Sequence, residues 1–307
     1  MNKKTTYLKL ICGICAISIS ALMVKEVSIG PTVSAFWRMF YAALLIYLVY
    51  ILESRGKLSK GWKNSAWLWP AFLAGFFLAI DMVIWHKTII YIGAGPATFL
   101  GNSQILFVTL FGAFVFKEKI GWLFPIIMPI VLYGLYLLIP SFNISVVRSS
   151  AYMMGLAVGA TYGGYLICLR YAKKASKEEY PEVLSLSFIM LVTSLGIATW
   201  GIGVERVKII SGNLHDHITM LVIALISNTL GWILIKSNIT RIPAHQGSLL
   251  LLMQPVLTTI WAGLFFAEAI TIAQLIGGVL VIGGIAAYQL TMELGTEDKR
   301  KKKRIAD

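Results

Sequence analysis

The chain has 307 residues, of which 58% are hydrophobic and only 13% are charged, and its mean hydropathy is +0.78. A soluble domain has about 25% charged residues, so this composition excludes an ordinary soluble enzyme and predicts an all-α polytopic membrane protein. The net charge of +13 does not indicate nucleic-acid binding, because the basic residues lie between apolar runs and in the tail, where they act as a topology signal.

Apolar runs long enough to cross a bilayer follow one another along the chain. A helix needs about 20 apolar residues to cross about 30 Å of hydrocarbon. We therefore predict ten spans, at residues 6–24, 31–52, 66–86, 95–116, 119–139, 149–170, 182–203, 218–236, 243–266 and 270–291. The first run resembles a secretory signal peptide. It lacks a clear cleavage site, and its loss would leave the first half one span short, so we retain it as a span.

The chain contains an internal duplication at a shift of 150 positions (104 to 254). Residues 89–120 match 239–270, and the polar matches Gln104/Gln254 and Glu118/Glu268 are not explained by apolar composition. Five spans per copy is an odd number, so the second copy must enter the membrane from the opposite side. We predict inverted repeats at 1–140 and 149–291, the arrangement of many secondary transporters, followed by a basic tail at 292–307 that anchors to anionic lipid.

The distribution of basic residues predicts the orientation. With the N-terminus inside, 21 of the 27 Lys and Arg residues lie on the cytoplasmic side, five lie outside, and Arg38 lies within a span. Because Lys and Arg concentrate on the cytoplasmic side of membrane proteins, both termini are expected there. The expected location is the inner (cytoplasmic) cell membrane.

Two ionisable residues lie inside predicted spans. Arg38 is roughly 10 Å from the outer start of the second span, and Asp81 is at a similar depth in the third. An ionisable group in a span costs about 2.5–3.5 kcal/mol on insertion scales, so it faces a bundle interior or a cavity. Equal depth predicts an Arg38–Asp81 ion pair, which either pins two helices or binds a charged or zwitterionic substrate. Trp37 and Trp85 beside them supply stacking surfaces or interfacial anchors.

Other polar residues are expected near the middle of the membrane. Gln104 and Gln254 fall mid-span, one in each repeat, where their amides either line a substrate cavity or join helices by hydrogen bonds. Gly155, Gly159 and Gly163 form overlapping GxxxG motifs that allow close helix contact. We expect a cavity whose lining also includes Asn102, Ser103, Tyr162, Asn228, Trp232, Gln246 and Ser248.

The remaining candidates lie at span ends. Glu118 and Glu268 close the turns after the fourth and ninth spans and are expected to cap helices or form gate contacts. His86 and His245 either carry a proton or make an interfacial hydrogen bond. We expect no catalytic residue, metal or cofactor, because the CxxC motif lies in an apolar run and neither GxxxxGK[ST] nor GxGxxG occurs.

Several short motifs resemble one known family. They are FWR at 36–38, DMVIWHKTI at 81–89 with the Ala/Gly/Pro-rich turn after it, and the repeated block ending in FKE at 116–118 and FAE at 266–268. With the two repeats, they make nearly the whole chain similar to the EamA family of the drug/metabolite transporter superfamily. The resemblance implies a basket of ten helices, a central cavity lined by spans three, four, eight and nine, and alternating access without ATP.

The same resemblance implies a secondary transporter of small polar metabolites. Members are mostly exporters of amino acids and related compounds, so we expect an exporter. The alternative is an importer or exchanger of a nutrient or metabolite, including nucleoside-like or S-adenosyl compounds. A membrane enzyme would need clustered Asp or His residues, which the sequence lacks, and a scaffold would have no solute-sized cavity. The expected partners are a small-molecule substrate and the bilayer, not nucleic acid, and the chain is a monomer or homodimer.

Overall fold

The computed structural model describes residues 3–23, 27–54, 65–92, 94–118, 120–139, 149–176, 181–210, 212–266 and 270–306, and all regular secondary structure in these ranges is helical. The first half contains α1 (Lys3–Ser18), α2 (Ser20–Met23), α3 (Pro31–Ser54), the 3₁₀ helix η3 (Ser65–Trp67), α4 (Leu68–Ile92), α5 (Ala94–Gly101), α6 (Gln104–Phe116) and α7 (Phe124–Leu137). The second half contains α8 (Ser149–Ser176), α9 (Glu182–Trp200), the π-helix η6 (Gly201–Glu205), α10 (Leu214–Ile223), the π-helix η7 (Ala224–Gly231), α11 (Trp232–Ile239), α12 (Ala244–Leu251), α13 (Met253–Phe266) and α14 (Ile272–Ala306).

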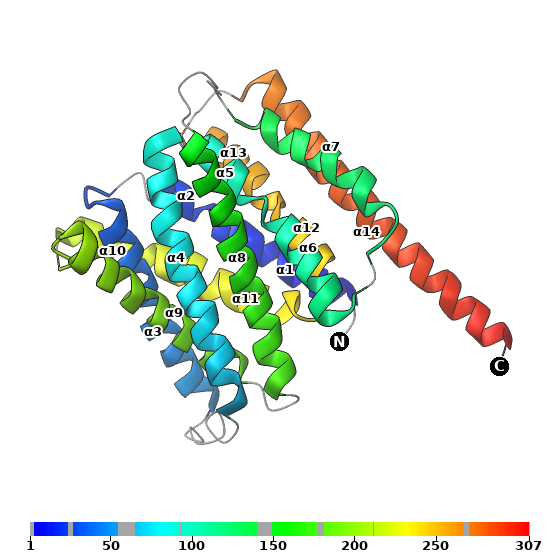
Figure 1. Ribbon diagram of the computed structural model, residues 1–307, viewed down its shortest axis with the longest axis horizontal. Helices are drawn as coiled ribbons and strands as arrows, with labels where there is room; N and C mark the ends of the chain where they lie inside the picture. Colours follow the sequence, from blue (N-terminus) through cyan, green and yellow to red (C-terminus); the bar gives the residue numbers. More distant parts are fainter. Residues whose placement is uncertain are drawn as a thin grey trace.

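The two halves pack against each other along most of their helices (Figure 1). Helix α4 lies along α8 and α9, α3 lies along α9, and α1 lies against η7 and α11. Helices α7 and α14 form a separate pair at one side of the bundle, and α14 projects beyond it (Figure 1). Their contact depends on glycine, because a Cβ added to Gly277 would lie 2.5 Å from the carbonyl oxygen of Gly134.

The helices have the length and composition of membrane spans. Within the described residues, seven are long and apolar enough to cross a bilayer, and two shorter apolar helices, Thr5–Ser18 and Phe124–Leu137, accompany them. Helix α8 has 28 residues but carries basic residues in its last turn. Helix α14 continues to Ala306, past the predicted span end at 291. The multi-pass architecture is confirmed, whereas ten crossings stay a prediction.

Two spans predicted as continuous are broken. The first break separates α5 from α6, where the N–H groups of Asn102 and Ser103 turn back to carbonyls three residues earlier. The second separates α12 from α13 at an equivalent place in the other half. Pro255 explains it, because a proline ring clashes with the carbonyl four residues earlier, here that of Leu251, the last residue of α12.

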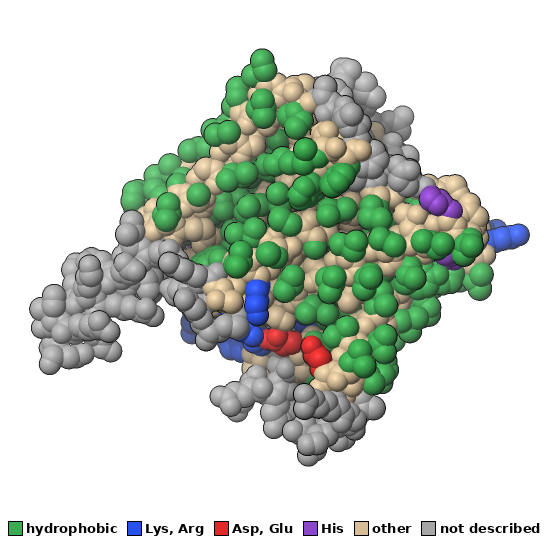
Figure 2. Space-filling view, turned by 180° about the vertical axis from the view of Figure 1, so that it is seen from behind, with side chains coloured by type: hydrophobic (Ala, Val, Ile, Leu, Met, Phe, Trp, Pro, Cys, Tyr) green, Lys and Arg blue, Asp and Glu red, His purple; other side chains and the backbone are tan. Residues whose placement is uncertain are grey.

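The surface matches a bilayer environment. Figure 2 shows hydrophobic side chains covering most of one face, with acidic side chains gathered at its lower edge. Exposed large side chains occur on many helices, among them Leu52 at 68%, Phe114 at 81% and Val279 at 71% exposure. Such continuous apolar surface is too extensive for a soluble monomer, and lipid covers it in a membrane protein.

Candidate functional site

The centre of the bundle holds Arg38 on α3 and Asp81 on α4, both buried. Nη2 of Arg38 donates to Sδ of Met82 at 2.8 Å. Oδ1 of Asp81 accepts from Oγ1 of Thr161 on α8 at 3.3 Å. The two charges interact through space, but no direct ion pair joins these described side chains, so the predicted Arg38–Asp81 pair is wrong. Each group is held by a neutral partner instead.

Further contacts near this centre join α8 to α11 and η7 to α3. Tyr162 follows Thr161 on α8, and its ring lies 6.5 Å from that of Trp232 at an interplanar angle of 68°. Nδ2 of Asn228 on η7 donates weakly to Sδ of Met39, the neighbour of Arg38, at 3.6 Å. These contacts link α3 to α4, α4 to α8, α8 to α11 and η7 to α3, and one contact is connected to the next by residues close together on the same stretch of chain. We call these residues the central ring: Arg38, Asp81, Thr161, Tyr162, Asn228 and Trp232.

Several buried polar atoms near the ring are unsatisfied in the described part of the chain. Arg38 Nε and Asn228 Oδ1 have no hydrogen-bond partner there. The same holds for Ser103 Oγ just before α6 and for Gln104 Oε1 and Thr109 Oγ1 in its first half. An unsatisfied buried polar group costs about 1–3 kcal/mol, so such groups mark positions where water or a ligand binds. The π-helix that carries Asn228 fits this interpretation, because π segments are frequent at functional sites.

The break between α5 and α6 lies against the glycines of α8. A Cβ on Gly159 would collide with Oγ of Ser103 and lie 2.8 Å from the backbone nitrogen of Gln104. Glycine at 159 therefore lets α8 approach the break, as its GxxxG motif predicts. Asn102 and Gln104 are buried beside it, while Gln254 is half-buried in the first turn of α13. No hydrogen bond between described side chains links the two glutamines, and their shared cavity stays a prediction.

Other predicted site residues lie away from the central ring or fall outside the described residues. Nε1 of Trp37 donates to the carbonyl of Ile209 at 3.0 Å, and its ring meets that of His217 edge-on at 4.8 Å. It therefore anchors the α3 end of the bundle. Trp85 is half-buried on α4. The side chain of His86 and all of Glu268 fall outside the described residues.

The end of the bundle where α3 begins is tied between the two halves. Both carboxylate oxygens of Asp216, at the start of α10, accept from Ser28, one from its backbone nitrogen at 2.8 Å and one from its hydroxyl at 2.7 Å. Glu205 accepts from Thr32 at 2.6 Å and from Nε1 of Trp200 at 2.8 Å. These hydrogen bonds to carboxylates join α3 and the residues before it to η6 and α10.

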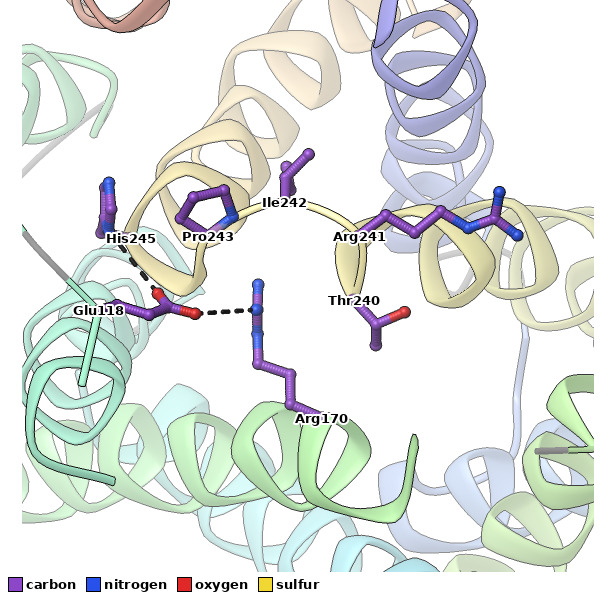
Figure 3. A pocket seen from close by; sticks show the side chains of 7 residues that line it. All are labelled: Glu118, Arg170, Thr240, Arg241, Ile242, Pro243 and His245. Atoms are coloured by element: carbon purple, nitrogen blue, oxygen red, sulfur yellow. Dashed lines mark hydrogen bonds and ion pairs between the residues drawn. The ribbon is translucent and has the colours of Figure 1, made fainter. Parts of the chain in front are cut away.

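The opposite end contains a cavity of about 350 Å³ (Figure 3). We call it the Glu118 pocket; it is lined by Glu118, Arg170, Thr240, Arg241, Ile242, Pro243 and His245. Glu118 follows the left-handed residue Lys117 (φ 54°) that ends α6. Its Oε2 accepts from the backbone nitrogen of Ala244 at 2.5 Å, which places a carboxylate at the positive N-terminus of α12. The same oxygen lies 3.8 Å from Nδ1 of His245.

Arg170 forms the other charged wall of this pocket. It rises from α8 toward the linker between α11 and α12 (Figure 3). Its Nη2 donates to the carbonyl of Ile239 at 2.8 Å, and its Nη1 lies 3.5 Å from Oε1 of Glu118. The pocket therefore holds both signs of charge, with Glu118 from the first half facing Arg170 from the second.

One buried cation was not predicted as a site residue. Lys236, at the end of α11, is 2% exposed, and its Nζ donates to Oγ of Ser185 at 2.6 Å and to the carbonyl of Glu182 at 3.0 Å. The sequence places it at the last residue of a predicted span, where it was counted as a cytoplasmic charge. The fact that Lys236 lies within the predicted span, and not in the loop after it, could have identified it as a buried cation. Nearby, Lys173 pairs with the Glu182 carboxylate at 2.6 Å.

Among the described residues, no group of three or more His, Cys, Asp or Glu side chains could hold a metal ion. What the site offers is a buried polar junction between two helical halves, with polar ties at both ends. Buried polar groups of this kind are unusual inside an apolar helical bundle, because they are costly there.

Comparison with known proteins gives the family. The profile of the EamA-like transporter family matches residues 4–139 and 149–288, one copy in each half. No curated protein matches the chain. One solved structure, described only as a crystal structure of a protein, is similar with a TM-score of 0.75 and 17% identity, over 94% of this chain and 98% of the other. That likeness shows the fold alone.

The chain belongs to the EamA-like transporter family, as its motifs predicted. The family consists of membrane transporters of the drug/metabolite superfamily rather than enzymes. The family match in each half also agrees with the duplication inferred from the repeated Gln and Glu.

Proposed function

We propose that the chain crosses the membrane ten times as two inverted five-helix repeats with both termini in the cytoplasm. The pattern of helix packing supports this. In two repeats of five spans, α1 corresponds to α8, α3 to α9 and α4 to α11. The contact of α4 with α8 then corresponds to the contact of α11 with α1. The contact of α4 with α9 corresponds in the same way to that of η7 with α3. The two helix breaks are equivalent under the same exchange.

Within this topology the protein is a secondary-active transporter of small polar metabolites, working as an exporter of amino acids or related compounds. The observation that carries this proposal is the central ring, where Arg38, Asp81 and Asn228 bring polar groups from both halves into the apolar bundle. An ionisable residue in a span is costly and marks a substrate or ion pathway. Arg38 and Asp81 do not pair directly, and they offer a carboxylate-binding and an ammonium-binding group for a zwitterion.

The hydrogen bonds that join the halves at the two ends of the bundle support alternating access. Asp216–Ser28 and Glu205–Thr32 join the halves at one end, and Glu118–Arg170 and Glu118–Ala244 join them at the other. Breaking one set while keeping the other would open the centre to one side at a time. No nucleotide is needed for such a cycle, since cargo binding biases the equilibrium between the two states.

The proposal is tested in vesicles that contain purified protein and are loaded with labelled amino acids. We expect solute-specific flux that Asp81→Asn and Gln104→Ala each reduce at least about tenfold. Asp81→Asn removes the negative charge and Gln104→Ala removes the amide, and a hydrogen bond to a charged group contributes about 1.5–3 kcal/mol. Unchanged flux in both variants, at normal amounts of protein, would make these residues structural. Preference for influx over efflux would identify an importer, and comparison of metabolites in cells with and without the protein would name the cargo.

A further inference from the structure

The Glu118 pocket lies away from the central ring and carries a pair of opposite charges on facing walls. We infer that it is a loading site for zwitterionic cargo, in which Glu118 binds the ammonium group and Arg170 the carboxylate. This inference rests on the proposed function and adds a second, earlier site for the same cargo.

The contact between the two walls is weak enough to be exchanged. Nη1 of Arg170 lies 3.5 Å from Oε1 of Glu118, at the limit of a hydrogen bond, while Nη2 makes a short bond of 2.8 Å to the Ile239 carbonyl. Glu118 is likewise anchored through its other oxygen, to the N–H of Ala244. Each charged group is thus held in place by a backbone partner, and the Oε1–Nη1 contact can open without releasing either side chain.

Opening that contact creates two matched half-sites. A planar guanidinium binds carboxylate through two parallel N–H donors, and a carboxylate oxygen accepts from ammonium. Cargo carboxylate replaces Oε1 at Arg170, and cargo ammonium replaces the guanidinium at Oε1. The net charge of the pocket does not change in this exchange, so a zwitterion fits better than a solute that bears only one of the two charges.

The rest of the pocket suits a small aliphatic side chain. Its volume of about 350 Å³ is within the range of small-molecule sites. Ile242 and Pro243 form an apolar wall on the linker between α11 and α12 (Figure 3). The side chain of Arg241 also lines the cavity and points away from Glu118 (Figure 3).

Loading also has a consequence for the tie between the halves. Glu118 belongs to the first half and Arg170 to the second, so cargo that separates them removes one of the contacts that close this end. Binding at the pocket is thereby coupled to opening toward the central ring.

The test measures binding to the purified full chain in lipid nanodiscs. The probes are the twenty amino acids, with L-leucine compared against 4-methylpentanoate and 3-methylbutan-1-amine, which each keep one of its charges. We expect at least one zwitterion to bind and each single-charge analogue of leucine to bind at least about tenfold more weakly than leucine. Glu118→Gln and Arg170→Gln are each expected to raise Kd about tenfold or more. Glu118→Gln retains an oxygen that accepts from Ala244, so the fold is preserved.

Lys174→Gln is the matched control. It removes one positive charge from the same end of α8, where Lys174 is exposed and its Nζ lies 5.6 Å above the Phe116 ring, and it should leave Kd unchanged. The inference is overturned if no zwitterion binds, if the single-charge analogues bind as well as leucine, or if the two pocket variants behave like the control. Vesicle flux separates the two proposals. Normal flux with unchanged KM in Glu118→Gln and Arg170→Gln rejects the loading site alone, whereas absence of flux in the natural protein rejects the transporter.

Discussion

At the scale of single residues, Lys236 shows how a cation is held inside an apolar bundle. Burial of a charge costs several kcal/mol unless partners surround it. Ser185 and the Glu182 carbonyl supply two oxygens within 3.0 Å of Nζ, both from the start of α9. The lysine therefore fastens the end of α11 to the beginning of α9, next to the pocket that we assign to cargo.

Ser185→Ala should destabilise the protein by about 1–3 kcal/mol, because it leaves the buried ammonium short of an acceptor. We expect a lower apparent Tm of the purified protein in detergent. The double variant Ser185→Ala/Lys236→Met should recover most of the loss, since methionine needs no acceptor. Ser194→Ala is the control on the same helix, because that hydroxyl donates to the Leu191 carbonyl of its own helix and, among the described residues, to no other helix. A double variant that melts below Ser185→Ala contradicts this account.

Residues also show where prediction from the sequence ends. Counting along a span predicted a similar depth for Arg38 and Asp81, and both side chains are buried, as the cost of exposing a charge to lipid requires. Counting does not give the direction in which a side chain faces, and neighbours on a helix diverge by about 100°. Arg38 consequently meets Met82 rather than Asp81. Trp37 points toward Ile209 for the same reason, and only the packed structure reveals these rotations.

At the scale of helices, the α7–α14 pair depends on the absence of side chains where its backbones cross. Gly134 and Gly277 approach so closely that a Cβ on either lies within 2.8 Å of the other's carbonyl oxygen. This contact holds together a pair that has few other partners in the bundle. Small residues commonly serve this purpose between membrane helices.

Two alanine substitutions in α14 should therefore have different effects. Gly277→Ala is expected to lower the apparent Tm, because the new methyl group forces α7 and α14 apart. Gly283→Ala has no atom within 4 Å of the new Cβ, and alanine is a better helix former by about 1 kcal/mol, so Tm should stay the same or rise. Equal shifts for the two variants would show that the Gly134 contact does not stabilise the pair.

Helix boundaries were predictable where the sequence carries a local cause. Glycine and proline placed most joints near their observed positions, and Pro255 contained the signal for the second break, which a hydropathy scan does not detect. The first break has no proline at the corresponding position. It depends on how Asn102 and Ser103 meet α8 at Gly159, which is a tertiary contact.

At the scale of the whole molecule, the inverted arrangement that we propose predicts which segments face the same side of the membrane. A reporter active only in the cytoplasm should work when fused to the C-terminus and fail when inserted at residues 140–148, the segment between the repeats. A reporter active only outside should give the reverse result. Both reporters should place the two sites on opposite sides of the membrane, because an odd number of spans separates them. Equal activity at both positions would rule out five spans per repeat.

The π-helix η7 accommodates one more residue than an α-helix of the same length would. Its hydrogen bonds reach one residue further than those of an α-helix, so Ala224–Gly231 stores a surplus residue between α10 and α11. Removal of exposed Leu225 would let the segment close into an ordinary α-helix while the flanking helices keep their phase. The fold would survive, but Asn228 would turn away from Met39 and the central ring would open. Such a deletion, tolerated in folding and defective in transport, would show that the surplus residue serves cargo handling and not assembly.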